Sequence, residues 1–217
     1  MRRPVVTVPL VKFCGLTRAI DVERAAALGV AAIGLVLAAG SPRQLQPEQA
    51  AALAAVARRQ PRPPRVVLLV RNARPDAVAG AIARIEPDLV QFHGDEDEAF
   101  CSRFGLPYWK ALGAAGLADL SALLAGHPGA EALLLDGHPP GAAGGAGHRL
   151  DWRRWPAASG RRLVLAGGLG PDNVAAAIAA TRPWAVDVSS GIESAPGIKD
   201  ERVMAAFMAA VAATAPA

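Results

Sequence analysis

Short uninterrupted apolar runs recur along the chain, and the stretches between them are long enough to hold a helix. Such a run is typical of a parallel strand that is covered on both faces, because a half-exposed strand alternates apolar and polar residues. We therefore predict eight buried parallel strands. In chain order they are Leu10–Cys14, Ala32–Leu37, Val66–Val70, Leu89–His93, Tyr108–Leu112, Ala132–Asp136, Arg162–Ala166 and Trp184–Val188.

Segments with apolar residues at helical spacing separate most of these strands. Pro47, Pro75 and Pro171 each suit a first helical turn, where the missing N–H has no partner to lose. Gly29 suits the residue that follows a helix. The gap at residues 137–149 is rich in glycine and proline and predicts a loop. The predicted helices are Ile20–Leu28, Glu48–Arg59, Asp76–Ile85, Asp95–Phe104, Asp172–Ala180 and Val203–Val211.

Eight strands that alternate with helices, without a linker or a change in composition, predict a single-domain (β/α)8 TIM barrel over residues 1–217. The length is near the short end of that fold's range, roughly 200 to over 400 residues. The alternative is an open doubly wound sheet. The chain has neither GxGxxG after the first strand nor GxxxxGK[ST], so the regular repeat favours closure.

Composition excludes several classes of protein. Apolar residues make up 52% of the chain and charged residues 19%, so it can bury a core and is not a disordered segment. The net charge is +4, and the basic residues, almost all arginine, are dispersed among acids. This dispersal argues against a nucleic-acid partner, whereas a modest basic excess suits a small anionic substrate.

The sequence also bears on the compartment. The two cysteines, Cys14 and Cys101, do not make a disulfide framework. The uncharged stretch Ala25–Pro42 contains turn-forming glycine and proline, so we predict a helix end, a strand and a loop there and no membrane span. The N-terminus has no signal-peptide pattern. We expect a cytoplasmic protein with no membrane partner.

In a barrel of this type the functional residues lie at the carboxyl ends of the strands. Glycine pairs and serine turns after strands seven and eight mark the usual phosphate site, because glycine lets backbone amides approach an anion closely. Ordinary tight turns are the alternative. The residues at these strand ends are Cys14, His93, Asp136, Gly167, Gly168, Ser189, Ser190 and Gly191.

Cys14 and Asp136 are candidates for an acid/base pair that moves a proton between carbons. Nearby positive charge can lower a thiol pKa, ordinarily about 8.5, enough for the thiol to serve as a base. A carboxyl shielded from water can hold its proton near neutrality and act as an acid. The alternatives are a small buried apolar residue for Cys14 and a capping or loop carboxylate for Asp136.

Two further residues are candidates for substrate binding. Arg43 follows the second strand, and its planar guanidinium suits a carboxylate; a solvated surface arginine is the alternative. His93 can donate to a substrate, with a hydrogen-bonded structural histidine as the alternative. Cys101 falls on a predicted helix and receives no role.

Several motifs resemble those of the phosphoribosylanthranilate isomerases, the (β/α)8 barrels of tryptophan biosynthesis. They follow one another in order from Val11 to about Phe207. They are KFCGLT at 12–17, SPR at 41–43, QFHGDE at 91–96, LLD at 134–136, GGAG at 144–147, Asp151–Trp152, LAGGL at 165–169 with Asn173, VDVSSGIE at 186–193 and PGIKD at 196–200.

The resemblance implies an intramolecular oxidoreductase that converts N-(5-phosphoribosyl)anthranilate to 1-(2-carboxyphenylamino)-1-deoxyribulose 5-phosphate. Asp136 would be the general acid that opens the sugar ring, and Cys14 the base that removes the C2 proton. Arg43 would hold the anthranilate carboxylate, and Asp187 would contact the sugar or its nitrogen. The turns at 167–168 and 189–191 would hold the phosphate. No metal or organic cofactor is expected, because the substrate nitrogen is the electron sink.

This chain departs from the family pattern in places. Ala146 stands where threonine is usual, and His148 where lysine is frequent. Residues 67–72 and 37–40 also differ, which affects loop details and the packing around the anthranilate ring. The acid, the base and the phosphate turns are all present.

Two other hypotheses stay open on the sequence. A histidine-pathway aldose–ketose isomerase or an epimerase would share the phosphate turns but would place an aspartate base where this chain has Cys14. A barrel that binds phosphate without catalysis would lack Cys14 or Asp136. The oligomeric state, monomer or homodimer, is not decided by the sequence.

Overall fold

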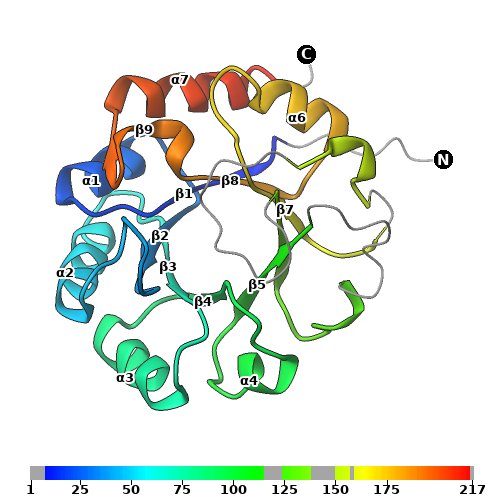
Figure 1. The fold of residues 1–217 in the computed structure, drawn as a ribbon. Helices are drawn as coiled ribbons and strands as arrows, with labels where there is room; N and C mark the ends of the chain where they lie inside the picture. The colour runs from blue at the N-terminus through cyan, green and yellow to red at the C-terminus, as the bar shows by residue number, and fades with distance from the viewer. Residues whose placement is uncertain (1–7, 115–123, 138–149, 157–158, 216–217) are drawn as a thin grey trace.

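The computed structural model describes residues 8–114, 124–137, 150–156 and 159–215. Its parallel strands form a closed barrel in which each strand pairs with the next and β1 also pairs with β8 (Figure 1). The prediction of a closed (β/α)8 barrel is therefore confirmed. The barrel strands are β1 (Leu10–Cys14), β2 (Ala32–Val36), β3 (Arg65–Val70), β4 (Leu89–Phe92), β5 (Tyr108–Gly113), β6 (Ala132–Asp136), β7 (Leu163–Leu165) and β8 (Ala185–Val188).

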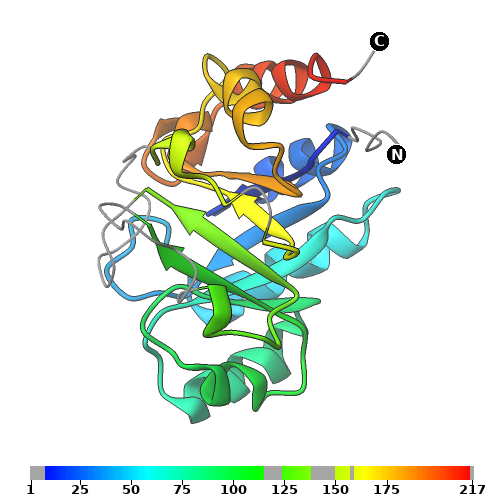
Figure 2. The ribbon, with the colours of Figure 1, turned by 90° about the vertical axis from the view of Figure 1, so that its right-hand side faces the viewer.

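Helices surround the barrel, and the arrowheads of the strands point toward one end of it (Figure 2). Pro47 and Pro75 begin their helices as predicted, and Gly29 follows the first helix with a φ of 78°. In the described ranges, every helix is too short or too polar to cross a bilayer. The helices are α1 (Ala19–Ala27), α2 (Pro47–Arg58), α3 (Pro75–Ile85), α4 (Glu98–Ser102), α6 (Val174–Thr181), α7 (Glu201–Ala212) and the 3-10 helix η1 (Trp152–Arg154).

Two predicted helices begin later than predicted, and the helix predicted from Val203 begins two residues earlier, at Glu201. Pro171 lies in a turn ahead of α6, because the Asn173 side chain accepts from the Gly170 amide and holds the chain out of the helix. The helix predicted from Asp95 begins only at Glu98, since the Glu96 carboxylate binds backbone amides of the preceding loops. Local polar contacts override helical spacing at both places.

The strands are buried on both faces, which explains their apolar runs. One face packs against the helices and the other fills the barrel. The outward cluster includes Phe13, Leu35 and Phe92. The inward cluster includes Val67 and Leu134. On β1 this alternation turns Phe13 outward, so Lys12 and Cys14 face inward.

Side chains close the amino-terminal end of the barrel. The rings of Trp109 and Trp184 meet edge to face with centroids 5.7 Å apart. Arg65 forms a bidentate ion pair with Glu131 at 2.7 and 3.1 Å, and the Trp109 indole donates to the same carboxylate at 3.2 Å. A ligand must therefore enter from the carboxyl ends of the strands.

A two-stranded antiparallel hairpin after β8 was not predicted. Its strands are β9 (Glu193–Ala195) and β10 (Ile198–Lys199), and Gly197 turns the chain with a φ of 80°. The hairpin is tied to the loop after β1, because Arg18 donates to the Lys199 carbonyl at 2.8 Å. These strands are short and largely exposed, so they lack the apolar run from which barrel strands are predicted.

Candidate active site

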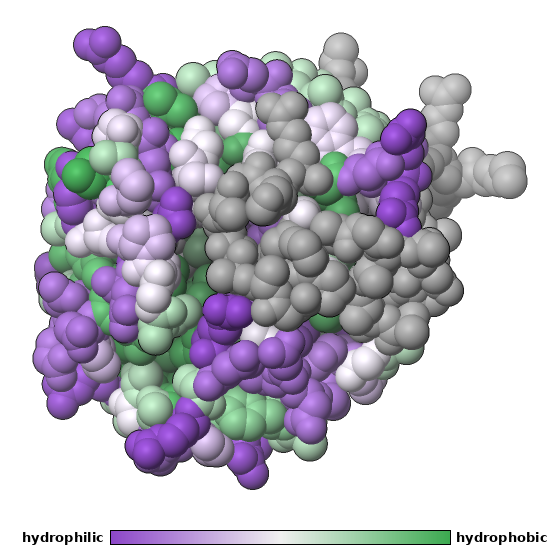
Figure 3. All heavy atoms as spheres, in the orientation of Figure 1, coloured by the Kyte–Doolittle hydropathy of each residue, from purple (hydrophilic) through white to green (hydrophobic). Residues whose placement is uncertain are grey.

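A cavity opens at the carboxyl ends of the strands, with a volume of about 690 Å³ including space open to solvent. Hydrophobic residues reach this face on the side of β2 and β3, inside a largely hydrophilic rim (Figure 3). The candidate site residues that line the cavity are Cys14, Arg43, His93, Asp136, Gly167, Gly168, Asp187, Ser189 and Ser190. The remaining candidate, Gly191, is not among the lining residues, and its packing against the neighbouring turn is described below.

Cys14 is the last residue of β1 and is only 5% exposed. Burial raises the pKa of its thiol, and Lys12 and Lys199 oppose this rise. The cations expected near the thiol are therefore present. Their effect does not outweigh desolvation, so the thiol pKa lies above its ordinary value.

Asp136 ends β6 and faces His93, which follows β4. The His93 Nε2 atom lies 3.9 Å from the Asp136 carboxylate. On the other side of the ring, Nε2 of the Gln91 side chain lies 3.1 Å from His93 Nδ1. An amide nitrogen only donates, so Nδ1 accepts, and the proton of a neutral imidazole is on Nε2, toward Asp136. His93 thus lines the cavity beside the candidate acid and is also hydrogen-bonded to the barrel interior.

Asp187, on β8, faces the barrel interior and forms an ion pair with Lys12 at 2.7 Å. Lys12 is 1% exposed, which makes it one of the most deeply buried side chains of the chain. Burial lowers the pKa of Lys12, but Asp187 and Cys14 together raise it above its ordinary value. The ammonium therefore stays charged inside the barrel.

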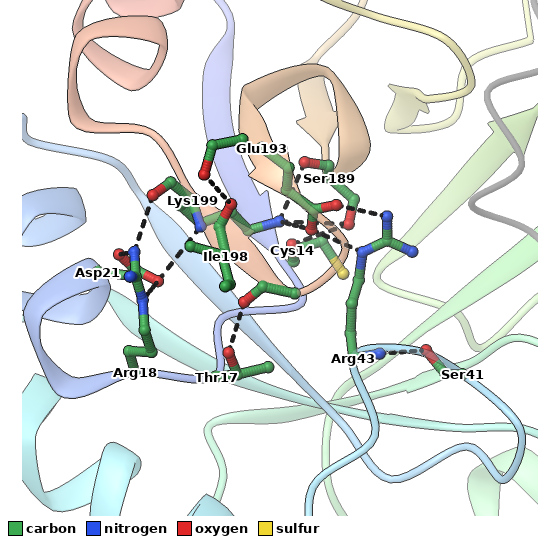
Figure 4. Close-up of polar contacts among 12 residues, drawn as sticks. Cys14, Thr17, Arg18, Asp21, Ser41, Arg43, Ser189, Glu193, Ile198 and Lys199 are labelled. Carbon is green, nitrogen blue, oxygen red and sulfur yellow. Dashed lines mark hydrogen bonds and ion pairs between the residues drawn. The ribbon is translucent and has the colours of Figure 1, made fainter.

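Arg43 comes from the loop after β2 and is held by a carboxylate that sequence reasoning did not single out (Figure 4). Its Nε and Nη2 atoms donate to the two oxygens of Glu193, each at 2.7 Å. Lys199 donates to the same carboxylate at 2.7 Å and to the Ser189 carbonyl at 3.0 Å. Glu193 and Lys199 were quoted as parts of motifs, but nothing in the motif indicates this pairing.

Gly15 makes room for this arginine. It has a φ of +73°, and a β-carbon built on it would lie 2.4 Å from Cδ of Arg43. Glycine is therefore required both by the backbone and by the space. Two of the three guanidinium nitrogens bind Glu193, and Figure 4 shows the third without a dashed line, on the side away from the hairpin.

The two turns predicted to bind phosphate lie against each other. Gly167 and Gly168 have consecutive left-handed φ values of 86° and 62°. A β-carbon on Gly191 would lie 1.8 Å from the Leu169 carbonyl oxygen, so glycine is needed for the turns to meet. Ser189 Oγ donates to the Cys14 carbonyl at 3.0 Å and joins the second turn to β1.

Some of the sequence motifs lie outside the described residues. These include the GGAG run at 144–147 with both of its departures, Ala146 and His148. Within the part of the chain that the structure describes, no group of three or more His, Cys, Asp or Glu side chains could hold a metal ion.

Comparisons with known proteins agree with one another. A family model described as N-(5'-phosphoribosyl)anthranilate (PRA) isomerase matches residues 11–210. The N-(5'-phosphoribosyl)anthranilate isomerase of Xanthomonas euvesicatoria pv. vesicatoria is 46% identical over 206 residues, which is 91% of this chain and 90% of that protein. That of Stenotrophomonas maltophilia strain R551-3 is 46% identical over 202 residues, again 91% of this chain and 90% of that protein.

Solved structures give the same result. The phosphoribosyl anthranilate isomerase of Thermus thermophilus superposes with a TM-score of 0.83 at 36% identity, over 94% of this chain and 98% of that one. A phosphoribosyl anthranilate isomerase in complex with reduced 1-(o-carboxyphenylamino)-1-deoxyribulose 5-phosphate has a TM-score of 0.82 at 30% identity, over 94% and 99%. The chain therefore belongs to the N-(5'-phosphoribosyl)anthranilate isomerase family.

Proposed function

We propose that this barrel isomerises N-(5-phosphoribosyl)anthranilate for tryptophan biosynthesis, with Asp136 as the acid and Cys14 as the base. Family membership supports the reaction. The observation that supports the two roles is the placement of both side chains on one cavity, from strands β1 and β6 on different sides of the barrel. Strand-end residues of this kind are where such barrels carry their chemistry.

The reaction is an Amadori rearrangement. Asp136 protonates the ring oxygen, the C1–O bond breaks, and the nitrogen lone pair forms a Schiff base at C1. Cys14 then removes the proton from C2. The C2–H electron pair forms a C1=C2 double bond, and the π electrons of the C1=N bond move onto the nitrogen, which gives an enolamine. Tautomerisation places a proton on C1 and leaves the ketone at C2. Hydrogen is only redistributed, so the chemistry needs no external oxidant or reductant.

A raised thiol pKa is compatible with this role. Less thiolate is present at neutral pH, but the thiolate that forms is a stronger base. The C2 proton is acidified by the adjacent protonated Schiff base. Positioned general acids and bases typically contribute about 10²–10⁴-fold each.

The rest of the cavity suits the two ends of the substrate. The turns at Gly167–Gly168 and Ser189–Ser190 offer backbone amides for the phosphate. Val36, Ala38 and Leu69 form an apolar wall beside Cys14 for the aromatic ring.

Charged side chains line the same cavity. Arg43 is held by Glu193 with its third nitrogen available for the anthranilate carboxylate. Lys12 binds one oxygen of Asp187, which leaves the other oxygen for the sugar or its nitrogen.

Three expectations from the sequence stay predictions: residues 1–217 as one domain, a cytoplasmic location, and a monomer or homodimer. A related structure from Thermotoga maritima is described as monomers generated from a dimeric phosphoribosylanthranilate isomerase, at 30% identity and a TM-score of 0.80. Light scattering of the purified protein would distinguish a monomer from a homodimer.

A direct assay tests the proposal. The purified protein is mixed with freshly generated phosphoribosylanthranilate in EDTA, and the loss of substrate fluorescence is followed. We expect turnover well above the spontaneous decay. Cys14→Ser and Asp136→Asn should each lower kcat at least ~10²-fold. Cys101→Ser is the matched control, since Cys101 is buried on α4 outside the cavity and its loss should leave kcat unchanged. Near-normal turnover of either site variant would remove that residue from the mechanism.

A further inference from the structure

We propose that Lys12 is a positioning residue whose buried ammonium is the counter-ion of the Cys14 thiolate. The proposal rests on the role of Cys14 as the base and adds a residue beneath it. Lys12 does not line the cavity, so it acts on the reaction through the lining residues beside it, Cys14 and Asp187.

Geometry brings the ammonium and the thiol to the same place. Lys12 and Cys14 lie two residues apart on β1, so both point into the barrel. A β-carbon built on Gly34, the β2 partner of Cys14, would lie 2.7 Å from Sγ and 3.2 Å from Nζ of Lys12. The absence of a side chain at Gly34 therefore leaves this space to the thiol and the ammonium.

The charges around the thiol are unbalanced when it is neutral. The cations that act on it are Lys12, Lys199 and Arg43. The carboxylates among them are Asp187, paired with Lys12, and Glu193, which binds both of the other cations. Asp136 and His93 face the cavity from β6 and β4. Three cations against two carboxylates leave one positive charge in this cluster, and a thiolate at Cys14 neutralises it.

Lys12 is the cation best placed for that task. After burial, the charge of Lys12 has the largest effect on the pKa of the thiol, larger than the effects of Asp187 and Lys199. Its alternative role is purely structural: an ion pair with Asp187 that fills the barrel. The two roles differ in what happens to the thiol when Lys12 is removed.

A substrate-free titration distinguishes them. In a Cys101→Ser background, Cys14 is the remaining thiol, and its ionisation is followed by thiolate absorbance and by the pH dependence of iodoacetamide alkylation. Lys12→Met should move the midpoint up by at least ~1 pH unit, the lower end of the effect of a close opposite charge. Alkylation at a fixed pH below the midpoint should slow about tenfold. A midpoint that matches the parent protein would overturn the proposal.

Lys110→Met in the same background is the matched control. Lys110 is also buried, at 2% exposed, and is also paired with a carboxylate, Glu96, at 3.0 Å. It lies on the outward face of β5, away from the cavity. Its loss therefore removes an equivalent buried ion pair, and the Cys14 midpoint should stay where it is. A shift equal to that of Lys12→Met would show a general effect of destabilisation and overturn the proposal.

Two more variants keep the proposal testable if the Lys12→Met protein does not fold. Lys12→Met with Asp187→Asn removes both buried charges, and the midpoint should still lie above the parent's, whereas a return to the parent value would indicate a purely structural pair. Gly34→Ala keeps every charge but places a methyl group against both Sγ and Nζ, and it should also raise the midpoint. Since no substrate is used, these results stand apart from the isomerase assay, in which an active Cys14→Ser protein would instead refute the base assignment.

Discussion

Gly191 sets how closely the two phosphate turns pack, and its replacement by alanine is a sharp test of the proposed phosphate site. The new β-carbon would lie 1.8 Å from the Leu169 carbonyl oxygen and 2.9 Å from its carbonyl carbon. Both are backbone atoms, so no side-chain rotation relieves the contact. One turn must move away from the other by more than about 1 Å, because non-bonded carbon and oxygen atoms do not approach closer than about 3 Å.

The size of the effect follows from this displacement. Overpacking of a tight contact costs roughly 1–3 kcal/mol of stability. A misplacement of about 1 Å at an anchoring site can lower kcat/KM by about 10²-fold. Gly191 lies behind the turn and does not line the cavity. We therefore expect kcat/KM of Gly191→Ala to fall about 10–100-fold, mainly through KM.

Gly80→Ala supplies the matched control, since it adds the same methyl group in the middle of α3 with no atom within 4 Å. It should stabilise the protein by roughly 0.5–1 kcal/mol and leave the kinetics unchanged. The measurements are KM, the inhibition constant of inorganic phosphate, and the thermal midpoint. If Gly191→Ala lowers the midpoint but leaves KM and phosphate inhibition unchanged, the phosphate does not bind at these turns.

Three other predictions concern Arg43, Glu193 and Cys14. Arg43→Ala should raise KM with a smaller effect on kcat, and an unchanged KM would place this side chain outside the substrate site. Glu193→Gln should also raise KM, because Arg43 and Lys199 both lose their shared carboxylate, and a kinetically silent variant would show that the pairing is only structural. Because burial raises the thiol pKa, alkylation of Cys14 should keep increasing with pH through about 8.5, the ordinary thiol value; a plateau below about pH 7 would contradict the sign.

The barrel was predictable because its strands are covered on both faces. Apolar runs marked every barrel strand to within one residue at either end, as for β6, where prediction and structure both give Ala132–Asp136. The β9–β10 hairpin was missed because it contributes little to the core. The early start predicted for α6 has a similar cause, since one side-chain contact of Asn173 decides it.

The sequence predicted the site residues that lie at the ends of strands, but not the ion pairs around them. Knowing where each strand stops is enough to bring Cys14 and Asp136 to one cavity. The ion pairs that control these residues join positions far apart in sequence: Lys12 and Asp187 are 175 residues apart, and Arg43 and Glu193 are 150 apart. Such pairs depend on which face of a strand each residue occupies and on the register around the closed barrel. Apolar runs in the sequence indicate neither the face nor the register.

The three lysines of the chain are all buried beside a carboxylate, which bears on the role given to Lys12. All are buried, at 1%, 2% and 3% exposed, while the other basic residues are arginines. Lys110 binds the Glu96 carboxylate and the Gly94 carbonyl, and Lys199 binds the Glu193 carboxylate and the Ser189 carbonyl.

The buried ammonium groups of Lys110 and Lys199 thus each take a full negative charge and a second acceptor, as their desolvation requires. At Lys12 the carboxylate is Asp187, and the other group that raises the pKa of its ammonium is the thiol of Cys14. A neutral thiol is a weak acceptor and a thiolate a strong one, so ionisation of Cys14 would give Lys12 the strong second acceptor that backbone carbonyls give Lys110 and Lys199.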